Sequence, residues 1–175
     1  MEPLPRSGLR LTAIFVGVVL AGLAVGWAVQ SPEEATVAQV GEMAPDFTVP
    51  IIGAGEFSLS EQLATEDKPI VLNLWASWCP PCRAETPEIS AFAAAHPEVK
   101  VIGVAVEDTE SAAAEFAAEF APAYDLAFGD PAFEAAYPRL GLPVTYVISA
   151  DGKVANLLNG LVNQQILEDL VAGLS

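Results

Sequence analysis

Hydrophobic residues form two kinds of pattern along the chain, and each predicts a different element. Residues 70–75 and 99–106 are short, continuous apolar runs of strand length, typical of strands covered on both faces of a sheet. Between them, apolar residues recur at i, i+3 and i+4 and predict a helix over 80–95, which His96 and Pro97 end. The order strand, helix, strand predicts an α/β domain.

Shorter patterns predict elements on either side of this unit. Asp151-Gly152 is a strong tight-turn signal, and it joins two apolar segments, 144–149 and 153–158, into a predicted hairpin. The remaining predicted elements are a short hairpin over 47–49 and 57–59, a helical turn at 60–63, and amphipathic helices at 113–120 and 166–174.

The N-terminal segment has a different character. Residues 11–29 carry no charge, and at about 1.5 Å per residue this length fits one bilayer crossing. Arg6 and Arg10 precede the segment, so we expect residues 1–10 to stay in the cytoplasm and the rest of the chain to face outward. We expect residues 30–45 to be a linker and residues 46–175 to form one domain.

A cleaved signal peptide is the alternative for residues 11–29. The apolar region of such a peptide is shorter, about 7–15 residues, and ends in an A-x-A-like site. Gly26-Trp27-Ala28 matches that site poorly. These criteria favour a retained transmembrane anchor.

The charge balance narrows the class of partner. The part of the chain after residue 29 keeps 5 basic and 22 acidic residues, a formal charge of −17. Nucleic acid is therefore not an expected partner. The charge favours a basic protein substrate through steering, or it serves solubility alone, because runs of charge usually mark solvated faces.

The two cysteines stand at Cys79-Pro80-Pro81-Cys82, where the predicted strand turns into the predicted helix. The positive end of a helix dipole and its free N–H groups stabilise a thiolate, and they bring a thiol pKa from about 8.5 toward roughly 7. Cys79 is thereby the expected nucleophile. Cys82, one turn further along, is the expected resolving thiol, which attacks a mixed disulfide on Cys79.

Three other uses of the cysteines fit less well. A structural disulfide would close a very small loop, and the entropic gain grows with loop length. A zinc site needs about four ligands, but the chain has two cysteines and one histidine, His96, which we expect to be a helix-terminal residue. A peroxidase would use a lone peroxidatic cysteine, whereas these are paired. The motif and its place favour redox chemistry.

The active-site stretch also resembles a known family. Residues 73–87, which read Asn-Leu-Trp-Ala-Ser-Trp-Cys-Pro-Pro-Cys-Arg-Ala-Glu-Thr-Pro, resemble the TlpA-like thioredoxins, the group that includes ResA and the CcmG (DsbE) reductases. Residues 44–47, 141–148 and 151–153 resemble further segments of the same family. The resemblance implies a thioredoxin-like fold, with a central mixed sheet flanked by helices.

The resemblance implies roles for three further residues. Pro143 takes the place of the family's cis-proline, although an unselected X-Pro bond is cis in only about 5–6% of cases. The Leu142 backbone is then expected to bind an extended substrate segment by strand addition. An ordinary proline at the start of a strand is the alternative. Glu85 matches the family's acidic residue after the second cysteine, and is expected to accept the proton of Cys82 and to raise thiol pKa values.

Three nearby residues complete the predicted site. Where this chain has Asn73, general thioredoxins have a buried aspartate, which leaves Glu85 as the candidate proton acceptor. A surface glutamate is the alternative for Glu85. Trp75 is expected in the core, and Trp78, beside Cys79, is expected to form part of an apolar docking surface for substrate.

The function that follows from the resemblance is thiol-disulfide exchange at a bacterial cytoplasmic membrane, on its periplasmic side, with no cofactor and no metal. Protein thiols and disulfides, including those of apocytochrome c, are the implied substrates. A membrane thiol-electron transporter is the implied reductant. A disulfide-donating oxidase and a non-catalytic binding module or chaperone stay open as alternatives.

Overall fold

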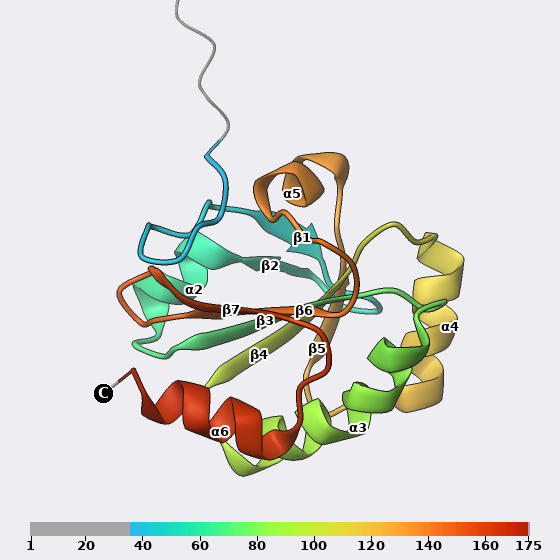
Figure 1. Cartoon of the computed structure of the whole chain (residues 1–175). Helices are drawn as coiled ribbons and strands as arrows, with labels where there is room; N and C mark the ends of the chain where they lie inside the picture. The colour runs from blue at the N-terminus through green and yellow to red at the C-terminus, as the bar shows by residue number, and fades with distance from the viewer. Residues whose placement is uncertain (1–35, 175) are drawn as a thin grey trace, which may run out of the picture. The chain divides into compact units, whose positions relative to one another are not determined.

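The centre of the domain is a five-stranded mixed sheet with the strand order β5-β4-β3-β6-β7. The structure, a computed structural model, describes residues 36–174 (Figure 1). Strands β3, β4 and β5 run parallel, whereas β6 and β7 run antiparallel to their neighbours. The strands are β3 (Ile70–Trp75), β4 (Lys100–Ala105), β5 (Asp125–Phe128), β6 (Val144–Ile148) and β7 (Val154–Asn159), with β1 (Thr48–Pro50) and β2 (Glu56–Ser58) in a separate hairpin.

Helices and the β1–β2 hairpin cover the two faces of this sheet. The helices are α2 (Leu59–Thr65), α3 (Pro80–Ala95), α4 (Glu110–Phe120), α5 (Pro131–Ala136) and α6 (Gln164–Ala172). Helices α3 and α6 lie side by side (Figure 1). Figure 1 shows α5 and the hairpin on the other side of the sheet.

Alternate side chains of β3 supply both faces of the core, as the period of a strand requires. Leu72 and Leu74 belong to the cluster under α2, α5 and the hairpin. Val71 packs among residues of α3 and α6. Trp75 belongs to a third cluster, which also contains Cys79 and Cys82. The predicted core position of Trp75 is confirmed. The chain reaches Cys79, the first cysteine of the disulfide, four residues after the end of β3.

The predicted strand over 70–75, the helix over 80–95 and the Asp151-Gly152 hairpin are confirmed. His96 is the C-terminal cap of α3. The sequence patterns missed β5 and α5, because a four-residue strand and a six-residue helix are too short to show a period. The local signal for α5 was its start, where the Asp130 side chain caps the helix and Pro131 occupies the first turn.

The domain begins earlier than residue 46. Its compact unit runs from Thr36 to Ser175. Ala38 is 3% exposed, and its N–H donates to the carbonyl of Ala136 at 2.8 Å. Ala44 donates to Gly152 at 2.9 Å. The Gly41 N–H also donates to the carbonyl of Val154, at the start of the edge strand β7. Residues 38–44, predicted as linker, therefore pack on the domain, because α5, the β6–β7 turn and β7 offer backbone carbonyls that polar linker composition does not reveal.

The predicted anchor, residues 11–29, lies outside the described residues. Within residues 36–174, no helix combines the length and the apolar character that crossing a bilayer requires.

Candidate active site

Cys79 and Cys82 form a disulfide at the N-terminus of α3, with a Cα–Cα distance of 5.3 Å. Cys79 is the N-cap residue, and its Sγ accepts a hydrogen bond from the Cys82 N–H at 3.2 Å. The two residues are 2% and 1% exposed. Exposure therefore does not distinguish the two cysteines in the oxidised protein, but their positions differ, because Cys79 caps α3 and Cys82 lies within its first turn.

Local sequence explains why the disulfide sits at this point. Strand β3 ends at Trp75, and the Cys79 N–H donates to the carbonyl of Ala76, which closes a turn. Pro80 and Pro81 then fill the first two positions of α3, where a helix has no use for the missing N–H groups. The turn thus delivers the Cys79 sulfur to the positive end of α3.

Glu85 lies one turn past Cys82 and is 1% exposed. Its Oε1 accepts a hydrogen bond from Asn73 Nδ2 at 2.8 Å, and its Oε2 accepts one from the backbone N–H of Val162 at 2.9 Å. Asn73 Nδ2 also donates to Oγ1 of Thr145 at 3.2 Å, directly across the β3–β6 pair. Glu85 is thus a buried carboxylate with two neutral donors, and not a surface residue.

Burial raises the pKa of the Glu85 carboxyl from 4.5 to about 7, while the hydrogen bonds from Val162 and Asn73 oppose this shift. The charged form has lost its water, and two neutral hydrogen bonds replace it in part. A carboxyl that titrates near neutral pH can both take up and release a proton there. Because residues three apart on a helix share a face, this carboxyl lies on the same side of α3 as Cys82.

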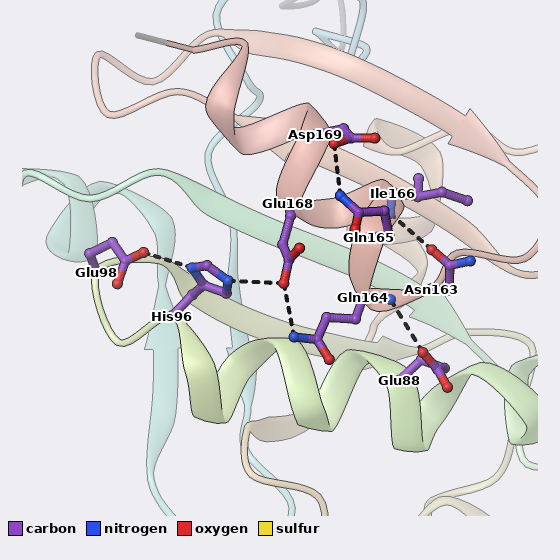
Figure 2. A network of polar contacts seen from close by, with 9 residues as sticks. All are labelled: Glu88, His96, Glu98, Asn163, Gln164, Gln165, Ile166, Glu168 and Asp169. Atoms are coloured by element: carbon purple, nitrogen blue, oxygen red, sulfur yellow. Dashed lines mark hydrogen bonds and ion pairs between the residues drawn. The ribbon is translucent and has the colours of Figure 1, made fainter.

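The Val162 N–H that binds Glu85 is held in place by the start of α6. Figure 2 shows polar contacts between α3 and α6 on this side of the domain. Gln164 N–H donates to Glu88 at 3.4 Å, and Glu168 lies 3.4 Å from Nε2 of His96. The Asn163 side chain caps α6 by accepting from the Ile166 N–H at 2.9 Å. These contacts fix α6 against α3 and so keep Val162 over Glu85.

Of the predicted substrate-binding residues, only Trp78 adjoins the disulfide in sequence; Leu142 and Pro143 lie far from it along the chain, just before β6. The Leu142–Pro143 peptide bond is cis. Leu142 is half-buried and packs against the cluster that contains both cysteines. In the part of the chain that the structure describes, neither the N–H nor the carbonyl of Leu142 has a backbone partner. The Trp78 side chain is 58% exposed, and its Nε1 donates to the carbonyl of Glu107 at 2.9 Å.

The structure adds residues that sequence reasoning missed. Asn73 lies within an otherwise apolar strand, and a polar residue there needs a buried partner, which is the signal that the sequence offers. Thr145 carried the same signal in β6. Val162 carried none, because it acts through its backbone. Asp108 also belongs to this group. Its carboxylate accepts hydrogen bonds from the N–H and the hydroxyl of Ser77 at 2.5 and 3.0 Å, and no sequence pattern predicts this contact.

No group of three or more His, Cys, Asp or Glu side chains is placed to hold a metal ion among residues 36–174.

Known proteins are similar in sequence to this chain over most of its length. The chain is 34% identical over 149 residues to a thiol:disulfide interchange protein DsbE homolog of Paracoccus denitrificans (strain Pd 1222), covering 81% of this chain and 78% of that protein. It is 32% identical over 138 residues to the thiol-disulfide oxidoreductase ResA of Oceanobacillus iheyensis, covering 74% and 70%. The resemblance to the DsbE and ResA group is confirmed.

Solved structures agree with these relatives. A crystal structure from Chlorobium tepidum, assigned as a thiol:disulfide interchange protein DsbE, superposes with a TM-score of 0.67 at 28% identity and covers 78% of this chain and 98% of its own. A secreted Mycobacterium tuberculosis disulfide oxidoreductase homologous to E. coli DsbE has a TM-score of 0.62 at 26% identity, covering 73% and 95%. Residues 40–157 match the AhpC/TSA family. The chain therefore belongs to the AhpC/TSA family, has the thioredoxin-like fold with a central mixed sheet, and is a thiol-disulfide oxidoreductase.

Proposed function

We propose that this oxidoreductase reduces protein disulfides outside the bacterial cytoplasmic membrane, with Cys79 as the attacking and Cys82 as the resolving residue. The observation that carries the proposal is the Cys79–Cys82 disulfide at the start of α3, backed by the buried carboxyl of Glu85. A thiolate at a helix N-terminus is the nucleophile in such exchange.

The reduction runs in two exchanges. The thiolate of reduced Cys79 attacks one sulfur of the substrate disulfide, forms a mixed disulfide and releases the other substrate sulfur as a thiolate. Cys82 then loses its proton to Glu85 and attacks Cys79, which releases the second substrate sulfur and leaves the Cys79–Cys82 disulfide. Two electrons pass to the substrate, and its two thiolates take up protons. A membrane thiol-electron transporter restores the reduced pair.

The surface beside the disulfide supports a protein substrate. The free N–H and carbonyl of Leu142 can pair with an extended segment, as in strand addition. Exposed apolar side chains lie on segments that adjoin this point: Trp78 next to Cys79, Leu140 two residues before Leu142, and Leu161 next to Val162. We propose that these side chains and the Leu142 backbone form the docking surface for a protein substrate. Apocytochrome c, before haem attachment, is the substrate that we propose, since the relatives include ResA and DsbE proteins.

Trapping variants test the assignment of the two cysteines. Cys82→Ser removes the thiol that ejects the partner, so the substrate should stay attached through Cys79 and appear as an adduct on non-reducing gels and in mass spectrometry. Cys79→Ser should trap little. Equal trapping by both variants would overturn the assignment of the nucleophile, and no trapping by either would favour a non-catalytic binding module.

Equilibration with glutathione tests the direction of electron flow. Reductases of this chemistry poise near about −270 mV and oxidases near about −120 mV. We expect a value close to the reductases. A potential near that of the oxidases would instead assign the protein to disulfide donation.

The proposed location rests on residues 11–29 as a retained anchor. The intact chain should fractionate with membranes, resist carbonate extraction, and expose its C-terminal domain to protease added from the periplasmic side. A mature soluble form that begins near Val29 would contradict the anchor and leave the exchange chemistry untouched.

A further inference from the structure

A polar network joins two loops that border the disulfide. The loop before α3 contains Ser77 and Trp78, and the loop after β4 contains Glu107 and Asp108. Ser77 donates twice to Asp108, and Trp78 Nε1 donates to the carbonyl of Glu107 at 2.9 Å. The exposed indole beside Cys79 is therefore held by the backbone of the β4–α4 loop.

Arg139 extends this network to the segment before Pro143. Its Nη2 donates to Glu107 Oε1 at 2.8 Å and to Glu134 Oε2 at 2.6 Å. The other oxygen of Glu134 accepts from the Glu107 N–H at 3.1 Å. Glu107 is thus fixed at its N–H, its carbonyl and its carboxylate. Its φ of 52° lies in the left-handed region, which a residue with a side chain keeps when its surroundings impose it.

The Arg139 pairs differ from ordinary surface ion pairs. The Arg139 side chain is 10% exposed, and it neutralises two carboxylates at once. It is also one of five basic residues after residue 29. Removing a mostly buried cation leaves Glu107 and Glu134 facing each other without compensation, which costs more than the loss of an exposed pair.

Arg139 stands three residues before Leu142, and its side chain links this segment to Glu107, whose carbonyl binds the Trp78 indole. We infer that Arg139 is a positioning residue for substrate recognition, which through Glu107 fixes the exposed Trp78 indole relative to the Leu142 backbone. An extended substrate segment can then meet both at once. This inference rests on the proposed function, because it assumes that a protein segment binds beside Cys79.

Arg139 has no hydrogen bond or ion pair to either cysteine in the described residues. Its loss should therefore weaken the binding of a protein substrate and spare the exchange step. For Arg139→Met in the full chain, we expect the KM for insulin to rise about fivefold, the order expected for one lost bonded contact. The kcat for insulin and the rate with dithiothreitol should each change less than twofold.

Arg139→Lys sharpens the test. An ammonium is a point charge without the planar fork of a guanidinium, so lysine should hold one carboxylate and give an intermediate KM. Acrylamide quenching of Trp78 provides a readout that needs no activity. The Trp78 contribution is identified by its absence in Trp78→Phe, and it should become more accessible in Arg139→Met and partly return in Arg139→Lys.

Lys100→Met is the matched control. Lys100 also forms a half-buried ion pair, with Asp125 at 2.6 Å, but it begins β4 whereas Glu107 follows the end of that strand. The Lys100→Met variant should have the same KM for insulin and the same Trp78 quenching as the wild type.

Unchanged KM and quenching in Arg139→Met would overturn the inference. Equal losses in the insulin and dithiothreitol rates, with a fall in Tm, would also overturn it, because they would make Arg139 merely structural. If the wild-type protein itself fails to reduce insulin, the proposed function fails, and the quenching result still decides whether Arg139 positions Trp78.

Discussion

The two ends of α3 each carry a group whose pKa is raised, but the physical causes are opposite. Near the N-terminal end, burial raises the pKa of Glu85 to about 7, because its charged form has lost water. At the C-terminal end, hydrogen bonds from His96 to Glu98, and less strongly to Glu168, raise the pKa of His96, because these acids favour its charged form (Figure 2). The surroundings of Glu85 therefore disfavour its charged form, whereas those of His96 favour its charged form.

This difference leads us to expect a chemical role for Glu85 and a structural role for His96. A buried carboxyl near a redox disulfide, bonded only by neutral donors, has the environment of a proton-transfer group. His96 stacks on Phe92 with ring centroids 4.7 Å apart and links α3 to α6, which is the environment of a structural contact. Both raised pKa values make the protein lose stability as pH rises, but removing each group should have different consequences.

The largest expected effect is on the pH dependence of stability in Glu85→Gln. Because the folded pKa lies above the unfolded value of 4.5, Glu85 contributes stability that is fully present below pH 4.5 and is lost as pH rises through about 7. This loss amounts to about 3 kcal/mol, and it should be absent from Glu85→Gln. Urea unfolding of the oxidised protein between pH 4 and 8 measures it.

Glutamine at position 85 also leaves one of the donors, Asn73 or Val162, without an acceptor, which adds a penalty that is constant with pH. The diagnostic quantity is therefore the slope and not the absolute stability. Glu115→Gln, an exposed acid on α4, is the matched control and should follow the wild type. A parallel pair of curves for wild type and Glu85→Gln would refute the assignment of the slope to Glu85.

Asn73→Leu should produce the next largest effect. It removes the donor to Glu85 Oε1 and to Thr145, so the unfolding free energy should fall by about 2 kcal/mol at neutral pH. The pKa of Glu85 should rise further, since this hydrogen bond holds it down. Carboxyl ¹³C NMR titration measures the shift. Thr145→Val, which removes only the second acceptor, is the control, and an equal shift there would contradict the role of Asn73.

The exchange rate tests the chemical side of the comparison. Without the buried base that takes the proton of Cys82, Glu85→Gln should reduce insulin about tenfold more slowly at pH 7, a modest loss for general base catalysis. The defect should shrink as pH rises, because hydroxide then removes the thiol proton. Stopped-flow rates across pH 6 to 9 measure it, and Glu115→Gln is the control. A wild-type rate for Glu85→Gln at pH 7 would make Glu85 a purely structural acid.

His96→Gln should have the smallest effect. The pKa of His96 is raised above its ordinary value of 6.5, so its stabilisation is fully present below pH 6.5 and is lost as pH rises through the folded pKa. We expect Tm to fall by at most about 2 °C at pH 5.5 and to match the wild type at pH 8.5. Exchange rates should not change. A larger loss at pH 8.5 than at pH 5.5 would reverse the sign and exclude the ion pairs as its cause.

The sequence determined the elements whose causes are local. Strand β3 follows from a continuous run of apolar residues, and the start of α3 follows from the Cys79-Pro80-Pro81-Cys82 motif, because proline suits the first turn of a helix. The β6–β7 turn follows from Asp151-Gly152. Resemblance to a family supplied the cis Leu142–Pro143 bond and pointed to Glu85, which no periodic pattern marked.

The tertiary structure decided everything that depends on distant neighbours. Glu85 is buried because Asn73 from β3 and Val162 from the segment before α6 close over it, and their separation along the chain hides this from any local pattern. Strand β5 and the docking of residues 38–44 depend on sheet edges that exist only after folding. The raised pKa of Glu85 has the same origin, since the loss of water around a carboxyl is a property of the packed domain and not of the residue.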